Sequence, residues 1–278
     1  EMEITTPIPV NQLAQLKASM GSQVSGLPLL STYYYELNTT KAPFNGARVR
    51  RALKMALDKD IIAEKVMGQG QRPAWLISQP EIGGVTLKAP DYASWPREKR
   101  IEEARKLLNE AGYNDAHPLS FNLLYNTMET HQRLAIAVSS MWKKNLGVEA
   151  KLQNQEWKTM LDTMHTGNFD AVRYAWIADY DDAVTFLNNF RTGDSENTSK
   201  YSNPAYDEVL HNAAKAKDVA ERGQYYQQAE DMLAQDVPAI PLYHYVRTHL
   251  VKPWVGGFEP DRLGRFYTKD LYIKKHNE

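Results

Sequence analysis

Cysteine is absent from the 278-residue sequence. Its absence excludes disulfide bonds, thiol nucleophiles and zinc sites with cysteine ligands. It does not fix the redox compartment, because a chain of this length can bury a core that needs no covalent cross-links. The remaining composition, 42% hydrophobic and 24% charged residues, is typical of a globular protein rather than a disordered one.

Long apolar runs and an excess of one charge are also lacking. No stretch approaches the roughly 20 apolar residues that a membrane-spanning helix requires. The 33 Lys and Arg residues nearly balance the 34 Asp and Glu residues, which gives a net charge of -1. This balance gives no electrostatic reason to expect a nucleic acid or an anionic membrane as partner. We therefore expect no nucleic-acid partner.

The motifs of common catalytic and metal sites are missing as well. The sequence contains neither G-x-x-x-x-G-K-S/T nor G-x-G-x-x-G, and no G-x-S-x-G. Its seven His residues form no H-E-x-x-H pair. The acidic run Asp179–Asp182 lacks the spacing of a calcium loop and is interpreted as a loop of solvated acids. We expect no cofactor, no metal site and no enzymatic activity.

Aromatic residues are plentiful, with 16 Tyr and 6 Trp. These side chains combine an apolar body with a polar tip, and they suit clefts that grip a ligand without selecting its side chains. The composition therefore favours a binding protein.

Periodicity predicts alternating helices and strands, which indicates an α/β or α+β domain with a mixed sheet. Asp58 is predicted to cap a second helix after a bend, and Gly68–Pro90 to be a long surface excursion. The predicted helices are 9–20, 49–67, 96–111, 131–145, 157–165, 184–190, 204–216 and 219–235. The predicted strands are 33–38, 119–125, 148–154, 169–178, 240–246, 249–254 and 271–273.

The segment Phe169–Tyr180 places polar residues in and at the end of an apolar strand. In an extended strand Arg173, Ile177 and Asp179 share one face, whereas Trp176 points to the other. A carboxylate buried at a strand end costs several kcal/mol unless it is paired. Two pairings remain open from the residues alone: a ligand ammonium, or an internal bridge between Arg173 and Asp179.

The sequence closely resembles the C-terminal part of the periplasmic oligopeptide-binding proteins and of the related murein-tripeptide-binding proteins, the solute receptors of ATP-driven peptide importers. The similarity covers essentially the whole chain. The matching stretches are Tyr33–Phe44, Val49–Asp60, Asn122–Thr127, Leu134–Val138, Met141–Gly147, Leu152–Thr159, Gly167–Asp170 and Leu250–Gly256.

The resemblance implies a periplasmic binding protein-like fold of class II, in which two lobes close on the ligand. It assigns residues 1–30 to a first-lobe segment, 31–246 to the second ligand-binding lobe, and 247–278 to a first-lobe return segment. The hinge strands would then lie near Leu30 and at Val246–Thr248. It also implies that an N-terminal half of the receptor is missing.

The resemblance further implies a set of ligand contacts. Asp179 matches the acid that receives the α-ammonium of the peptide, and Arg173 matches a cleft arginine that helps to hold the ligand carboxylate. His131 matches a histidine that can meet the C-terminal carboxylate of a longer peptide. The other residues of the predicted site are Trp157, Trp176 and Tyr245 as pocket walls, together with Tyr34, Asn126 and Ile177.

Two positions depart from the family pattern. Oligopeptide receptors resemble this sequence except that they carry Lys at the position of Met67 and Arg at that of Met164. The thioethers would remove two point charges and leave flexible apolar surface, so we expect weaker binding of short peptides that rely on these cations. Murein-tripeptide receptors also lack the Lys but keep the Arg.

The resemblance therefore implies a periplasmic receptor that binds short peptides and delivers them to the membrane permease of an ATP-driven importer. An alternative is a murein-tripeptide receptor of the same fold, which serves cell-wall recycling. A third possibility is an enzyme or chaperone that has borrowed the lobe. A fixed catalytic pair near Asp179 would favour the third, and the sequence shows none.

Overall fold

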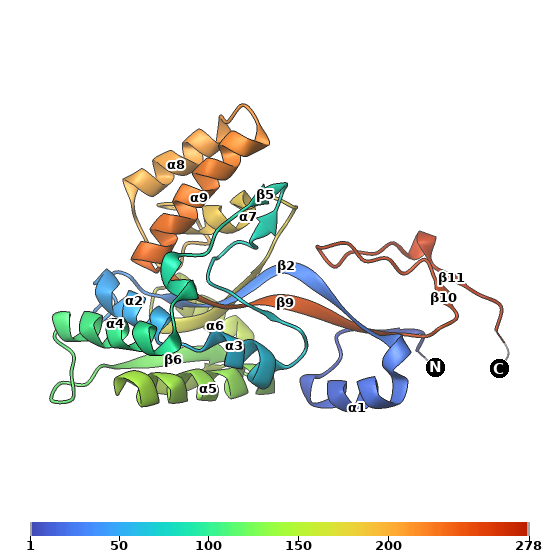
Figure 1. Ribbon diagram of the computed structural model, residues 1–278, viewed down its shortest axis with the longest axis horizontal. Coiled ribbons are helices and arrows are strands. Elements are labelled where there is room, and N and C mark those ends of the chain that lie inside the picture. Colours follow the sequence, from blue (N-terminus) through green and yellow to red (C-terminus); the bar gives the residue numbers. More distant parts are fainter. Residues whose placement is uncertain (1, 277–278) are drawn as a thin grey trace.

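The computed structural model describes residues 2–276, which form a rounded body and a narrower arm (Figure 1). Two long strands, β2 (Val24–Leu37) and β9 (Ala239–Val251), run side by side from the body into the arm. The arm carries β1 (Ile4–Thr5), α1 (Val10–Met20), β10 (Val255–Gly256) and β11 (Tyr272–Ile273).

A mixed sheet, with seven strands among the described residues, organises the body. Its order is β1-β9-β2-β8-β6-β7, and the short β3 also pairs with β9. β6 is parallel to β7 and β8, whereas the other pairs are antiparallel. The predicted mixed α/β architecture is therefore confirmed. The strands not yet defined are β3 (Arg72–Pro73), β6 (Ser120–Asn126), β7 (Glu149–Gln155) and β8 (Ala171–Ile177).

Side chains alternate across the sheet and enter different cores. Leu123 and Ala171 face one core, while their neighbours Leu124 and Val172 face another. The first core packs under α2 (Ala47–Met55), α4 (Arg97–Glu110) and α5 (Glu129–Leu146), and the other lies against α6 (Trp157–His165). A further core is enclosed by α7 (Val184–Leu187), α8 (Pro204–Ala214) and α9 (Val219–Asp236).

The predicted bend at Asp58 is confirmed. α2 ends at Met55, and the carboxylate of Asp58 accepts the backbone N–H of Ile61 at 3.1 Å, which caps α3 (Lys59–Ile61). A π-helical turn (Ile62–Met67) continues from it. The remaining helical segments are short 3-10 turns at Gly21–Gln23, Asp91–Ser94, Asn188–Phe190 and Thr268–Asp270.

The prediction that Gly68–Pro90 is a surface excursion is wrong. The segment crosses the body and buries several of its side chains, among them Leu76, Ile77 and Gln79. The buried carboxylate of Glu230 accepts the backbone N–H groups of Ile77 and Ser78, so irregular backbone is tolerated inside. The segment also contains a hairpin, β4 (Glu81–Ile82) and β5 (Val85–Thr86).

The two long strands also differ from the prediction. β9 is continuous where two separate strands were expected, and β2 begins at Val24 rather than Tyr33. Each strand supplies the pairing partner of the other, which extends both beyond the locally strand-prone residues. Their register shifts between Pro28 and Thr32, close to the predicted hinge. The three domain segments themselves stay a prediction.

Candidate functional site at the open edge of β8

One edge of β8 is only partly paired. β8 pairs with β2 over Ala171–Ile177, but it pairs with β6 only at Ala171 and Val172. Among the described residues, the edge from Arg173 to Ile177 therefore has no strand beside it. A free strand edge presents unpaired N–H and C=O groups, which are a template for another extended chain.

The hydrogen-bond pattern between β2 and β8 determines which way the backbone groups of β8 point. The N–H of Ala178 donates to the carbonyl of Leu30 at 2.8 Å. Antiparallel pairs alternate between bonded and non-bonded residues, so the backbone groups of Ala175 and Ile177 are directed away from β2. These two residues can therefore offer hydrogen bonds to a ligand backbone.

Arg173 lies at one end of the open edge. Its guanidinium donates to Asn126 Oδ1 at 3.1 Å and to Tyr245 Oη at 3.2 Å, and it lies 4.8 Å from the centre of the Tyr33 ring. The side chain is buried, and within residues 2–276 its Nε atom has no hydrogen-bond partner. Neutral polar groups thus surround the guanidinium, and its Nε–H is left without a partner among the described residues.

His131 belongs to the same cluster. It is buried, and its Nδ1 lies 3.3 Å from the hydroxyl of Tyr33. Burial, together with the nearby charge of Arg173, lowers the pKa of His131 to about 3. The imidazole is therefore neutral at neutral pH and offers a hydrogen bond rather than a charge to a carboxylate.

Two of the three predicted aromatic walls, Trp157 and Trp176, lie on the opposite face of β8, whereas Tyr245 lies with Arg173. Trp157, at the start of α6, stacks on Tyr174 with ring centres 6.4 Å apart and an angle of 7° between the planes. Tyr174 also meets Tyr34 edge to face. Trp157 is 42% exposed, whereas Tyr34 is 2% exposed. Tyr34 is therefore a core residue beneath the wall, and Trp157 can contact a ligand directly.

Asp179 lies just beyond the end of β8 and is exposed. Its Oδ2 accepts the hydroxyl of Thr185 at 3.2 Å, and its backbone N–H donates to the same hydroxyl at 3.1 Å. Within the described range Asp179 forms no ion pair, and Arg173 bonds Asn126 and Tyr245 instead. The expectation of a buried carboxylate is wrong, and so is the internal bridge.

The other two acids of this loop, Asp181 and Asp182, bond to other segments of the chain. Asp182 accepts the hydroxyl of Tyr226 at 2.6 Å and pairs with Arg222 at 3.5 Å. Asp181 accepts the backbone N–H of Gly83 at 2.8 Å. The interpretation as a loop of solvated acids therefore fails for these two, because partners distant in sequence fold against them. Asp179 is the acid that remains available.

The structure thus brings the predicted residues together around one strand but divides them between its faces. Asn126, His131, Arg173 and Tyr245 form one cluster; Tyr34, Trp157 and Trp176 lie on the other side; Asp179 stands at the end, beside Ile177, which is 49% exposed. No motif or periodicity indicated Thr185, which bonds the carboxylate of Asp179 and accepts the indole N–H of Trp176 at 3.2 Å. Alternation along Tyr33–Tyr35 could have indicated that Tyr33 and Tyr34 point to opposite faces of the sheet, where both are buried in different cores.

Met67 and Met164 do not form ligand-facing surface in this structure. Their side chains are 3% and 1% exposed, and they pack in two different cores. The expected flexible apolar surface is therefore not present at either position, because α6 and the π-helical turn bury these side chains. Their effect on peptide preference stays a prediction.

Within the part of the chain that the structure describes, no group of three His, Asp or Glu side chains could hold a metal ion. None of the described helices is long and apolar enough to cross a membrane. The body presents an open strand edge with the cation of Arg173 at one end and the carboxylate of Asp179 beyond the other, and paired strands join it to the arm.

Comparison with known proteins identifies the family. Residues 1–198 match the family described as bacterial extracellular solute-binding proteins, family 5 Middle. The chain belongs to this family, whose members are receptors for solutes. The predicted family and fold are thereby confirmed.

Individual relatives cover nearly the whole chain. It is 48% identical to the periplasmic oligopeptide-binding protein OppA of Salmonella typhimurium, over 97% of this chain and 50% of that protein. It is 42% identical to the periplasmic murein peptide-binding protein MppA of Escherichia coli, over 99% of this chain and 52% of that protein. The chain therefore spans about half the length of the curated relatives it matches.

Solved structures agree. The chain superposes on the murein tripeptide binding protein MppA of Escherichia coli with a TM-score of 0.91 at 42% identity, covering 99% of this chain and 54% of that one. The same TM-score, identity and coverage hold for OppA of Haemophilus influenzae in complex with the peptide RPPGFSPFR.

Proposed function

We propose that this chain supplies a ligand-binding lobe of a periplasmic receptor that captures short peptides for an ATP-driven importer. The observation that carries the proposal is the open edge of β8, with the buried guanidinium of Arg173 at one end and the exposed carboxylate of Asp179 beyond the other. Membership in a family of solute receptors, and 48% identity to an oligopeptide-binding protein, support it.

In this proposal an extended peptide lies along β8 as an added strand. Its backbone bonds the free groups of Ala175 and Ile177, which every peptide sequence can do. Asp179 accepts the α-ammonium in a charge-assisted hydrogen bond, and this contact fixes the register. Arg173 turns its free Nε to a carbonyl or carboxylate of the ligand. Binding and release complete the cycle, so no chemical step is required of any residue.

The exposed aromatic groups would line the spaces for peptide side chains. Trp157 presents an exposed ring supported by Tyr174. Trp176 is half-buried and fixed by Thr185. Rigid aromatic walls give apolar contact area at low entropic cost without demanding one side-chain chemistry. This arrangement suits a receptor that accepts many peptide sequences.

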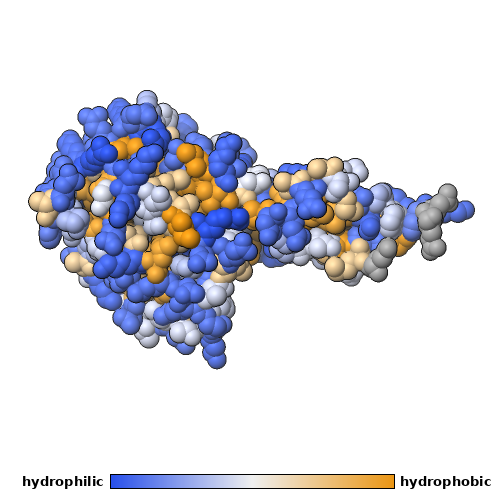
Figure 2. Space-filling model, turned by 90° about the horizontal axis from the view of Figure 1, so that it is seen from below, coloured by the Kyte–Doolittle hydropathy of each residue, from blue (hydrophilic) through white to orange (hydrophobic). Residues whose placement is uncertain are grey.

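A cleft needs a second wall. Because the chain covers about half of its relatives, we propose that a further lobe of the same receptor closes over β8 and that the closed form meets the membrane permease. Figure 2 shows hydrophobic residues gathered on the body toward its junction with the arm, where such a lobe would lie. The 278 residues alone are expected to bind peptide poorly, and micromolar or tighter binding by this chain would contradict that.

The test compares Asp179→Asn with wild type in the two-lobed receptor, by calorimetric titration with tri-alanine and with N-acetylated tri-alanine. Wild type should prefer the free peptide, and Asp179→Asn should lose about tenfold or more in affinity for it, as expected for a hydrogen bond between charged groups. Asp60→Asn, which alters an exposed acid elsewhere, is the matched control. Equal affinity of wild type for both peptides would refute the proposed site.

A murein-tripeptide receptor is the second candidate, favoured by 42% identity to MppA and by the equal TM-score. Native mass spectrometry of the purified receptor separates the two. A heterogeneous set of retained peptides supports the general peptide receptor, whereas a single muramyl-type species supports the murein receptor. Turnover of a retained species would instead indicate an enzyme.

A further inference from the structure

The loop between β10 and β11 contains a tightly closed turn at Asp261–Arg265. The carboxylate of Asp261 accepts the backbone N–H groups of Leu263 at 2.9 Å and of Arg265 at 2.8 Å. The backbone N–H of Asp261 donates to the carbonyl of Arg265 at 2.9 Å. One side chain therefore fixes the backbone of the whole turn, which lets it act as a rigid unit.

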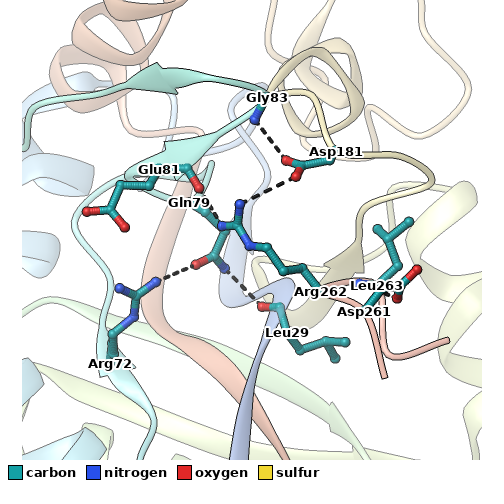
Figure 3. Close-up of polar contacts among 9 residues, drawn as sticks. All are labelled: Leu29, Arg72, Gln79, Glu81, Gly83, Asp181, Asp261, Arg262 and Leu263. Atoms are coloured by element: carbon teal, nitrogen blue, oxygen red, sulfur yellow. Dashed lines mark hydrogen bonds and ion pairs between the residues drawn. The ribbon is translucent and has the colours of Figure 1, made fainter. Parts of the chain in front are cut away.

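This turn folds back from the arm onto the body (Figure 1). The backbone N–H of Leu30 donates to the carbonyl of Arg262 at 2.7 Å, and Leu263 packs against the apolar core under α8 and α9. The side chain of Arg262 reaches between two body segments, where it bonds Asp181 Oδ2 at 3.4 Å and the carbonyl of Glu81 (Figure 3). Both apolar and polar contacts therefore hold the turn against the body.

The turn contacts the loop that carries the proposed ammonium acceptor. Arg265 donates from Nη2 to the backbone carbonyl of Asp179 at 2.8 Å. On the other side of the loop, Gly83 of the β4–β5 hairpin donates to Asp181 Oδ1 (Figure 3). A Cβ on Gly83 would lie 2.9 Å from the carbonyl oxygen of Asp181, so hairpin and loop are in close contact.

We propose that the turn Asp261–Arg265 is a positioning element that couples the placement of Asp179 to the seating of the arm on the body. Arg265 holds the backbone of Asp179, while Thr185 holds its carboxylate. A shift of the arm therefore moves the acid that receives the ligand ammonium. This inference rests on the proposed function for its ligand, but the contact itself does not.

Because Arg265 is charged, its positioning role can be distinguished from its electrostatic effect on ligand binding. The guanidinium of Arg265 bonds the backbone carbonyl of Asp179, and its positive charge disfavours an ammonium ion at the neighbouring carboxylate. Removing the charge alone would raise affinity for a free amino terminus, whereas loss of positioning would lower it. The two effects have opposite signs, so the direction of the change identifies the role.

The first test uses the two-lobed receptor and needs no ligand. Hydrogen exchange of the amides in the Asp179–Asp182 loop is measured in Arg262→Gln, Arg265→Gln and the control Arg48→Gln. Arg48 is exposed on α2, and its one ion pair within residues 2–276 is with Glu110, at 3.8 Å. Exchange in the loop should rise at least about threefold in the two turn variants and stay unchanged in the control. Unchanged exchange in both turn variants overturns the proposal.

The second test uses the two-lobed receptor and the ratio of affinities for tri-alanine over N-acetylated tri-alanine. Arg265→Gln should lower this ratio at least about fivefold while affinity for the acetylated peptide is kept. Gly264→Ala gives a perturbation without a charge change: its φ is +73°, and a Cβ would lie 2.6 Å from a nitrogen of Arg247. It should lower the ratio as well.

The outcomes distinguish the proposed function from the positioning role of the turn. A wild-type ratio near one refutes the proposed function, and the exchange experiment still decides on the turn. A high wild-type ratio that Arg265→Gln leaves unchanged or raises overturns the positioning role. A lowered ratio together with faster exchange in the loop supports it.

Discussion

Thr185 holds Asp179 at two points, because its hydroxyl donates to the carboxylate at 3.2 Å and accepts the backbone N–H at 3.1 Å. The same hydroxyl accepts the indole N–H of Trp176 at 3.2 Å. A hydroxyl has one donor and two acceptor sites, so all of its capacity is used here. One side chain on α7 thus fixes both the acid and the aromatic wall of the proposed site.

Thr185→Val removes these three hydrogen bonds and keeps the shape of the side chain. We expect the free energy of unfolding to fall by about 1 to 3 kcal/mol, because two N–H groups lose their acceptor. Thr185→Ser retains the hydroxyl and is the control. Urea denaturation measures both, and a Val variant as stable as the Ser variant would show that the hydroxyl contributes nothing.

Glu36 gives a pH dependence with a defined sign. Its buried carboxylate accepts the Thr198 hydroxyl at 2.8 Å and the Ser199 N–H at 2.7 Å. Burial raises the pKa of Glu36 from 4.5 to about 7, although these hydrogen bonds oppose the shift. Between these values the folded chain keeps a proton that the unfolded chain releases. The Glu36 contribution to the free energy of unfolding therefore decreases as the pH rises through this window.

Glu36→Gln removes that ionisation, while its amide can still accept from Ser199 and donate to Thr198. The free energy of unfolding of the variant relative to wild type should therefore increase by about 3 kcal/mol between about pH 4 and pH 8. Glu64→Gln, at an exposed position on the π-helical turn, should show no such trend. Chemical denaturation at several pH values checks this, and a difference independent of pH would disprove the assignment.

Gly83→Ala tests the contact between the β4–β5 hairpin and the acidic loop. Both Gly83 and Gly112 have a positive φ, +59° and +89°, but a Cβ on Gly112 meets nothing within 4 Å. Gly112→Ala therefore reports backbone strain alone, about 1 kcal/mol. Gly83→Ala should cost about 1 to 3 kcal/mol more, because its Cβ crowds Asp181. If thermal denaturation shows the same loss of stability for both variants, the Asp179–Asp182 loop can move away from the added Cβ without a measurable cost.

Met164→Arg distinguishes a core position from a ligand position. Met164 packs with Met160 and Phe169 at 1% exposure, so an arginine there would be buried without a partner. We expect a loss of several kcal/mol in the free energy of unfolding. Met164→Leu keeps the apolar volume and should cost less than about 1.5 kcal/mol. An arginine variant as stable as the leucine variant would indicate that the site opens to solvent.

Much of the local structure follows from the sequence. The helix of Trp157–His165 has the predicted limits, and Asp58 caps where predicted, because apolar periodicity and capping chemistry act over a few residues. The burial of Gly68–Pro90 does not follow from its Gly and Pro content, because it depends on Glu230, far along the chain, which accepts backbone N–H groups of this segment inside the body. The proposed ligand residues came from resemblance to a family rather than from local pattern.

The sequence by itself determined the family, the mixed α/β architecture and the positions of Arg173 and Asp179 around one strand. Only the tertiary structure decided that these two residues do not pair, that His131 is buried and neutral, and that Met67 and Met164 lie in cores. The physical reason is the distance along the sequence over which each interaction acts. Periodicity and caps depend on neighbours along the chain, whereas pairing, burial and the pKa depend on groups that folding brings from far away.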